Sequence, residues 1–147
     1  ITNEDEIRTI LCDPDIYDTI ASDECPAIDD FEIPFDNHRY IGGFVNGEII
    51  ALMVYHTYKD GNKCHVQVLP GHRKEYAQKF GEQSLMFQGT QPLYAEIAGL
   101  YLNVLDFALS FGFETVDKKI ADYKKNGQLY DTYILRFNDG IHPRFNR

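Results

Sequence analysis

The 147-residue chain contains few cysteines, no tryptophan and no long apolar run. Cys12, Cys25 and Cys64 are an odd number and none has C-x-x-C spacing, which argues against a disulfide framework and against structural zinc. No apolar stretch approaches the roughly 18 residues that cross a bilayer, and the acidic start ITNEDEIR lacks the pattern of a signal peptide. We therefore expect a cytoplasmic protein with reduced thiols and no membrane partner.

Basic residues are also scarce. The 14 Lys and Arg face 23 Asp and Glu, which gives a formal net charge of -9 and no basic surface for nucleic acid. The acids are concentrated in residues 1–36, the acidic segment, where Arg8 is the single basic residue. This segment is either a solvated face or a wall that attracts a cationic ligand.

The spacing of apolar residues predicts each helix and strand. A hydrophobic fraction of 44% is typical of one globular domain, which we place at 1–137 and follow with a loose tail, 138–147. Thr2 with Asp5 resembles a capping box, and Asp13-Pro14 is typical of the start of a second helix. The pattern predicts helices over 3–12, from 14 onward, over 73–88 and over 100–111, and strands over 39–45, 48–58, 62–69, 93–97, 113–123 and 129–137.

The order ααβββαβαββ predicts an α/β fold of three layers, a mixed central sheet with helices on both faces. Asn46-Gly47 and Asn126-Gly127 predict tight hairpins, and residues 23–38 read as a surface loop. Gly42-Gly43 lies inside a strand, which predicts either a bulge or a place where the backbone meets a ligand.

The turn at Asp60-Gly61 predicts the register of the next hairpin. If these two residues form its centre, Tyr55 lies opposite Val66 and His56 lies opposite His65 on the other face. Two neighbouring imidazoles would titrate as a coupled pair, because two adjacent positive charges repel.

A change from strand to helix organises the stretch from Cys64 to Gln88. Pro70 and Gly71 end the strand, and helical spacing begins near Arg73. The first N–H groups of a helix have no partner within it, and the helix dipole places partial positive charge there. This turn is therefore a candidate anion site.

The element order, the turn VLPGHR and the helix end SFGF resemble the GNAT superfamily of acyl-CoA N-acyltransferases. The segments DPDIYDTIASDE, CHVQVLPGHRKEYA and FALSFGF look most like small GNAT-like proteins encoded by tailed phages, which would place the protein in a host cytoplasm. The resemblance spans about residues 2–137, and the family's first strand would lie ahead of Ile1. It implies the three-layer GNAT fold and acetyl-CoA, or a similar acyl-CoA, as the cosubstrate.

The resemblance also implies the residues that hold acetyl-CoA. In the family, pantetheine lies between two splayed strands and the pyrophosphate lies on the following turn. The strand contacts would come from Val66, Gln67 and Val68, and the turn contacts from Gly71, His72, Arg73 and Lys74.

This sequence departs from the family at four positions. Tyr76 and Gln78 stand where the family has small residues beside the pyrophosphate. Tyr101 stands where it often has an asparagine, and Ala108 stands where it often has a tyrosine that protonates the leaving thiolate.

The best candidate for a catalytic base is His65, because an imidazole titrates near neutral pH and the family often places its base on this strand. Tyr101 is a candidate donor to the thiolate. In the alternative interpretation His56 and His65 fill a half-buried face and Tyr101 is a packing residue. A metal held by the two histidines would need a third ligand, which no spacing supplies.

Two functions follow from the resemblance. The first is an N-acetyltransferase acting on a primary amine, either a cationic small molecule such as a polyamine or an amine of a protein. The second is a catalytically degenerate GNAT-fold protein with a binding or structural role, for example a phage accessory or virion component. The sequence leaves open whether the chain forms a homodimer.

Overall fold

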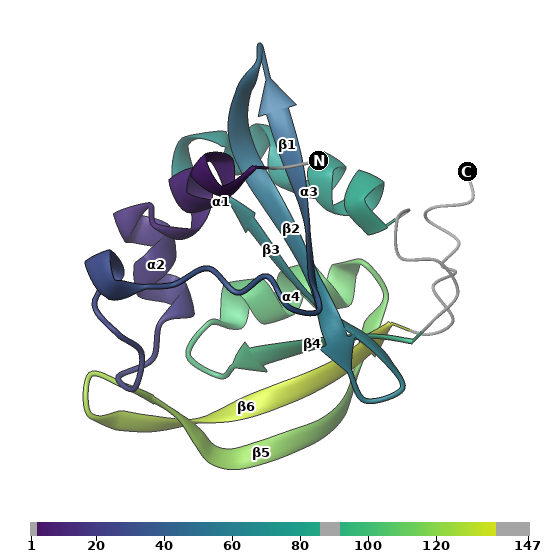
Figure 1. Cartoon of the computed structure of the whole chain (residues 1–147). Helices are drawn as coiled ribbons and strands as arrows, with labels where there is room; N and C mark the ends of the chain where they lie inside the picture. The colour runs from purple at the N-terminus through teal and green to yellow at the C-terminus, as the bar shows by residue number, and fades with distance from the viewer. Residues whose placement is uncertain (1–2, 86–91, 138–147) are drawn as a thin grey trace.

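A computed structural model describes residues 3–85 and 92–137 (Figure 1). The regular elements follow the predicted order, with a short 3-10 turn before β1 and another before α3. They are α1 (Glu4–Leu11), α2 (Pro14–Ile20), β1 (His38–Val45), β2 (Glu48–Tyr58), β3 (Gly61–Val68), α3 (Arg73–Leu85), β4 (Leu93–Ala98), α4 (Leu102–Ser110), β5 (Phe113–Lys125) and β6 (Gln128–Phe137). The predicted continuation of α3 to residue 88, most of the turn at 89–92 and the tail lie outside the described residues.

Side-chain caps begin both N-terminal helices. The capping box of α1 is formed by Asn3 and Glu6, so the predicted pair of Thr2 and Asp5 was one residue too early. Asp13 begins α2 as predicted, because its carboxylate accepts the N–H groups of Asp15 and Ile16.

The strands form one mixed sheet in the order β1-β2-β3-β4-β6-β5. Ile7, Ile10 and Ile16 of α1 and α2 pack on Leu52 and Val54, on one face of β2. The opposite face carries α3 and α4 over a second cluster that includes Met53, Tyr55, Leu85 and Phe111. The predicted three-layer α/β fold is confirmed.

β3 and β4 are parallel but stay together only at their first residues. The pairs are Asn62 with Leu93 and Lys63 with Tyr94, after which the strands separate. Figure 1 shows β3 and β4 starting from a common region and running apart. Gly61 permits the close start, because a Cβ there would lie 1.9 Å from the carbonyl oxygen of Pro92. The splay between these strands is what the family resemblance implies.

The predicted register between β2 and β3 is wrong by two residues. Tyr58 pairs with Gly61, so the turn is Lys59-Asp60 and not Asp60-Gly61. Tyr55 therefore pairs with Cys64, and His56 pairs with Lys63. A shift of two residues keeps each side chain on its face, so His56 and His65 still share one face of the sheet.

The two predicted Asn-Gly turns are confirmed. Asn46 and Asn126 have positive φ values of 53° and 52°, each followed by a glycine that also has positive φ. The register of β1 and β2 shifts between Gly43 and Phe44, which confirms the predicted bulge. The ring of Phe80 fills the space that a Cβ at Gly43 would need.

Candidate active site

The splay exposes one side of the β3 backbone. The N–H of Asn62 points toward β4, because it donates to Pro92, and the carbonyl of Val68 also points away from β2. Backbone groups alternate along a strand, so Val66 directs its N–H and C=O into the gap as well. Gln67 directs its backbone groups toward β2, where it pairs with Leu52. Of the three predicted strand contacts, the geometry favours Val66 and Val68.

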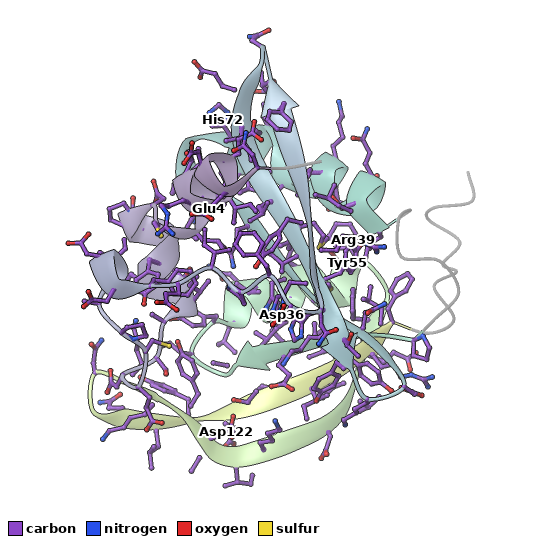
Figure 2. The ribbon with its side chains drawn as sticks, in the orientation of Figure 1. Glu4, Asp36, Arg39, Tyr55, His72 and Asp122 are labelled. Atoms are coloured by element: carbon purple, nitrogen blue, oxygen red, sulfur yellow. The ribbon has the colours of Figure 1, made fainter. Side chains whose placement is uncertain are left out.

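The predicted anion site is a 3-10 turn, Pro70–His72, that leads directly into α3. The N–H of His72 bonds to Leu69, and the N–H of Arg73 bonds to Pro70. Arg73 also turns its side chain back to the strand, where Nε donates to the carbonyl of Val68 at 2.9 Å. Gly71, Arg73 and Lys74 are exposed. Figure 2 shows His72 near the top of the molecule, beyond the end of the β3 strand.

Tyr76 lies beside this turn, with its ring centre 6.1 Å from that of His72, whereas Gln78 is directed along α3. Tyr76 packs with Ile50, Ala51 and Val68 and lines a cavity of about 160 Å³ between α3 and the β1-β2 hairpin. Gln78 donates to Glu82, one helical turn further along α3. The side chain of Tyr76 is thus held against the β1-β2 hairpin, and that of Gln78 is held along α3.

His65 lies on the α1-α2 face of the sheet, opposite Val54, and shares that face with His56. Their Nε2 atoms are 3.1 Å apart, their ring centres are 5.3 Å apart and their planes differ by 7°. The distance between the ring centres is longer than the distance between the two Nε2 atoms by about two ring radii, one for each imidazole. Both Nε2 atoms therefore lie close to the line that joins the two ring centres. The rings are therefore nearly coplanar and joined by an N–H···N hydrogen bond.

A third imidazole covers this pair. His38 of β1 stacks on His56 with ring centres 4.8 Å apart. Its Nδ1 donates to the carbonyl oxygen of Asp36 at 2.7 Å, which fixes Nδ1 as the protonated nitrogen when the ring is neutral. Figure 2 shows Asp36 just ahead of β1. The sequence analysis identified His56 and His65 but did not identify His38.

Glu96 of β4 lies on the same face and was also missed. Its carboxylate is 3.3 Å from Nζ of Lys63 and 3.5 Å from Nζ of Lys119, and it accepts a hydrogen bond from Tyr58. The side chains of Lys63 and Glu96 are only 15% and 16% exposed. The available signal was a lone charge between Ala95 and Ile97 in an otherwise apolar strand.

Burial and neighbouring charge adjust the basicity of this face. His65 is exposed, yet desolvation by the surrounding protein still lowers its pKa, and His56 and Lys63 lower it further. Desolvation, followed by Lys63 and His38, also lowers the pKa of His56. Burial acts to raise the pKa of Glu96, but its bonds to Tyr58 and the charges of the two lysines outweigh this, so that pKa is lowered. The histidines are neutral at pH 7 and the carboxylate is ionised.

Tyr101 begins α4 and packs on the core of the α3-α4 face. Its ring lies edge-on to Tyr123 of β5, with centres 6.2 Å apart. It is thus on the opposite side of the sheet from His65, and the structure does not join the two predicted catalytic residues by a contact. Cys64 is buried beneath α3, where desolvation raises the pKa of its thiol to about 12, as expected of a core residue.

Part of the acidic segment has a structural role. The carboxylate of Asp23 accepts the N–H groups of Asn126 and Gly127, each at 2.8 Å. Lys125 donates in turn to the carbonyls of Asp18 and Ala21 near the end of α2. We call these contacts the latch, because they tie α2 and its following loop to the β5-β6 turn.

The described residues form neither a metal site nor a membrane-spanning helix. Residues 3–85 and 92–137 contain no group of three or more His, Cys, Asp and Glu side chains arranged to hold a metal ion. In the same ranges, no helix has the length and apolar character needed to cross a membrane.

No family model matches the chain, and no curated protein matches its sequence. Several solved structures do match its fold. The spermidine N-acetyltransferase of Vibrio cholerae, in complex with CoA and spermine, has a TM-score of 0.77 at 14% identity over 95% of this chain and 92% of that one. An N-acetyltransferase from Staphylococcus aureus Mu50 has a TM-score of 0.62 at 12% identity over 70% and 68%.

A GNAT superfamily phosphinothricin acetyltransferase from Sinorhizobium meliloti, in complex with AcCoA, has a TM-score of 0.59 at 16% identity over 67% of this chain and 60% of that one. At these identities the likeness establishes the fold. The chain has the GNAT fold, and these structural neighbours are N-acetyltransferases.

Proposed function

We propose that this protein is an N-acetyltransferase that uses acetyl-CoA, or a similar acyl-CoA, to acetylate a primary amine. The observation that carries the proposal is the splay of β3 and β4, with the backbone groups of Val66 and Val68 directed into it and a helix start at its end. Extended amides such as those of pantetheine pair with exposed strand backbone. Neighbours with this fold hold CoA or AcCoA, which supports the same cosubstrate here.

The residues present fit this cosubstrate. Val66 supplies a backbone donor and acceptor for pantetheine, with Gln67 beside them on β3. At the start of α3, the N–H groups of Gly71 and Lys74 and the positive charges of Arg73 and Lys74 would hold the pyrophosphate, with the ring of His72 beside them. Gly71 leaves the turn open, because a Cβ built there meets no atom within 4 Å.

In the proposed reaction, His65 removes a proton from the acceptor amine. The amine nitrogen then bonds to the thioester carbonyl carbon, and the carbon–sulfur bond breaks with its electron pair left on sulfur. His65 is neutral at pH 7 and so has a nitrogen open to this proton, although its lowered pKa makes it a weaker base than a free imidazole. We retain Tyr101 as the proposed donor to the thiolate, although its contact with Tyr123 lies on the other face.

The acceptor is proposed to be a cationic amine, such as a polyamine or a protein amine. α1, α2 and the loop after them cover the face that carries His65, and Glu24, Asp29 and Asp30 of that loop are exposed. These carboxylates would attract positive charge toward this face. The neighbour from Vibrio cholerae, which is bound to spermine, is consistent with this substrate class.

A second function, a binding or structural module without catalysis, is favoured by Ala108. This half-buried residue packs against the α3-α4 core and offers no proton to a thiolate. The resemblance to phage-encoded GNAT-like proteins agrees with such an accessory or virion role in a host cytoplasm.

Calorimetric titration with acetyl-CoA separates the two functions. We expect wild-type binding in the micromolar range and no measurable binding by Gly71→Asp, which places a carboxylate where the pyrophosphate would lie. Gly71→Asn has nearly the same shape without the charge and should bind within a few-fold of wild type. Arg73→Glu should also abolish binding. No heat and no thermal shift with wild type at millimolar acetyl-CoA would exclude the acetyltransferase.

A further inference from the structure

We propose that His56 completes the base: it accepts a proton from His65 across their shared hydrogen bond while His65 takes one from the acceptor amine. This inference rests on the proposed function and adds a positioning residue to it. Its geometric basis is the coplanar pair of rings with Nε2 atoms 3.1 Å apart. A hydrogen bond between two imidazole nitrogens requires one protonated nitrogen and one bare nitrogen.

The surroundings decide which ring donates. His56 makes a hydrogen bond to the backbone of Thr57 that acts to raise its pKa, so the ring donates to that backbone carbonyl. Because Nε2 of His56 faces His65, the donor is Nδ1. Nε2 of His56 is then the bare acceptor, and Nε2 of His65 carries the proton. This leaves Nδ1 of His65 as the basic nitrogen of the neutral pair.

The proton step is balanced within the pair. The amine N–H bond breaks as Nδ1 of His65 gains that proton, and the proton on Nε2 of His65 moves to Nε2 of His56. The positive charge ends on His56, which carries protons on both nitrogens, and His65 is neutral again. The pair resets when the proton on Nε2 of His56 returns to Nε2 of His65 and His65 releases its Nδ1 proton to solvent.

Neighbouring groups limit the pair to one proton. His38 on β1 and Lys63 on β3 oppose positive charge on the two rings, and Glu96 on β4 favours it. A second proton would turn both facing nitrogens into donors and break the bond between them. The pair is therefore neutral at pH 7 with one bare nitrogen open to a proton, and its lowered pKa makes it a weaker base than a free imidazole.

The first test uses the protein alone and does not depend on catalysis. Nitrogen-15 NMR of the imidazole rings should report an Nε2–H tautomer for His65 and an Nδ1–H tautomer for His56. The two rings should titrate together as the pH falls, with one proton shared between them. Independent titrations near pH 6.5, or the same tautomer in both rings, would overturn the pair.

The second test uses acetyl transfer. His56→Phe keeps a flat ring beside His38 but cannot accept the proton, so kcat should fall about 10-fold or more with no change in the Kd of acetyl-CoA. His56→Gln can still accept the hydrogen bond from His65, so it should keep the orientation but not the proton transfer. For both variants we expect the acidic limb of the pH-rate profile to move from its wild-type position.

The outcomes distinguish this inference from the proposed function. If wild type acetylates amines and both variants match its rate and pH profile, the role of His56 is wrong and the acetyltransferase stands. If wild type binds no acetyl-CoA, the acetyltransferase and the proton step both fail, whatever the NMR reports about the pair.

Discussion

Arg73 donates through Nε to the carbonyl oxygen of Val68, with 2.9 Å between the two atoms. The bond joins the first residue of α3 to the last residue of β3, across the turn that carries Gly71 and His72. The arginine therefore fixes how the strand passes into the helix, in addition to any contact with a bound anion.

Arg73→Ala should consequently weaken both the fold and the ligand site. We expect a loss of about 1 kcal/mol in the free energy of unfolding, typical of one hydrogen bond, together with weaker acetyl-CoA binding. Urea denaturation measures the first effect and calorimetry the second. Lys79→Ala, an exposed charge on the same helix, is the control. Equal urea midpoints for the two variants would show that the Val68 bond does not support the turn.

The latch predicts a pH-dependent loss of stability when Asp23 is changed. The N–H groups of Gly127 and Asn126 lower the pKa of Asp23, so its contribution is fully present above pH 4 and disappears as the pH falls through its folded pKa. Asp23→Asn should melt below wild type at pH 7, and the gap should narrow as the pH is lowered from 4 toward 3. Asp29→Asn, which has the same charge change outside the latch, should melt like wild type at both pH values.

Local chemistry explains which parts of this fold were predictable. Asp13 caps α2 through its immediate neighbours, and Asn46-Gly47 forms its turn through its own backbone preferences. These interactions span a few residues, so the sequence carries them. The latch joins Asp23 to Gly127, 104 residues away, and no local pattern encodes that contact.

The misplaced β2-β3 turn has a similar cause. Gly61 looks like a turn residue, yet it is glycine because Pro92 of a distant strand approaches it. The candidate site likewise combines local features, which the sequence predicts, with contacts between distant strands, which it does not. The strand-turn-helix around Arg73 was evident from the sequence, whereas the stacking of His38 on His56 and the ion pairs of Glu96 depend on how four strands align.

Packing at the β1 bulge gives a third stability test. A Cβ at Gly43 would lie 2.7 Å from ring atoms of Phe80, so Gly43→Ala should destabilise the protein by about 1–3 kcal/mol. Adding Phe80→Leu removes part of the ring, and the double variant should lose less than the sum of the single losses. Gly71→Ala is the control, because its Cβ meets nothing within 4 Å. Additive losses, measured by urea denaturation, would contradict the contact.

Glu96 should tune the histidine pair. Its negative charge favours protonation of His65 and His56, so Glu96→Gln should lower the pKa of both rings. The histidine signals in an NMR titration should then move at lower pH than in wild type. Glu82→Gln removes a charge on α3, across the sheet, and should leave the titration unchanged. An upward shift with Glu96→Gln would mean that this carboxylate does not act on the pair.

The exposed part of the acidic segment predicts how the acceptor is attracted. Glu24, Asp29 and Asp30 can be neutralised together without touching Asp23, whose carboxylate is engaged in the latch. For a polyamine acceptor, this triple variant should raise KM several-fold at low ionic strength and leave kcat unchanged. The difference should fade at high salt, because exposed charges are screened within roughly 10 Å at 0.1 M.

The matched control removes the same number of charges elsewhere. Asp106, Glu114 and Asp122 are exposed on α4 and β5, and Figure 2 shows Asp122 on the lower strand, away from Glu4 of α1. Long-range attraction by net charge alone would raise KM equally in both triple variants, whereas a local acceptor wall requires the larger effect at the N-terminal loop. If KM rises equally in the two triple variants, the attraction comes from the net charge of -9, and Glu24, Asp29 and Asp30 have no local role in drawing the acceptor to this face.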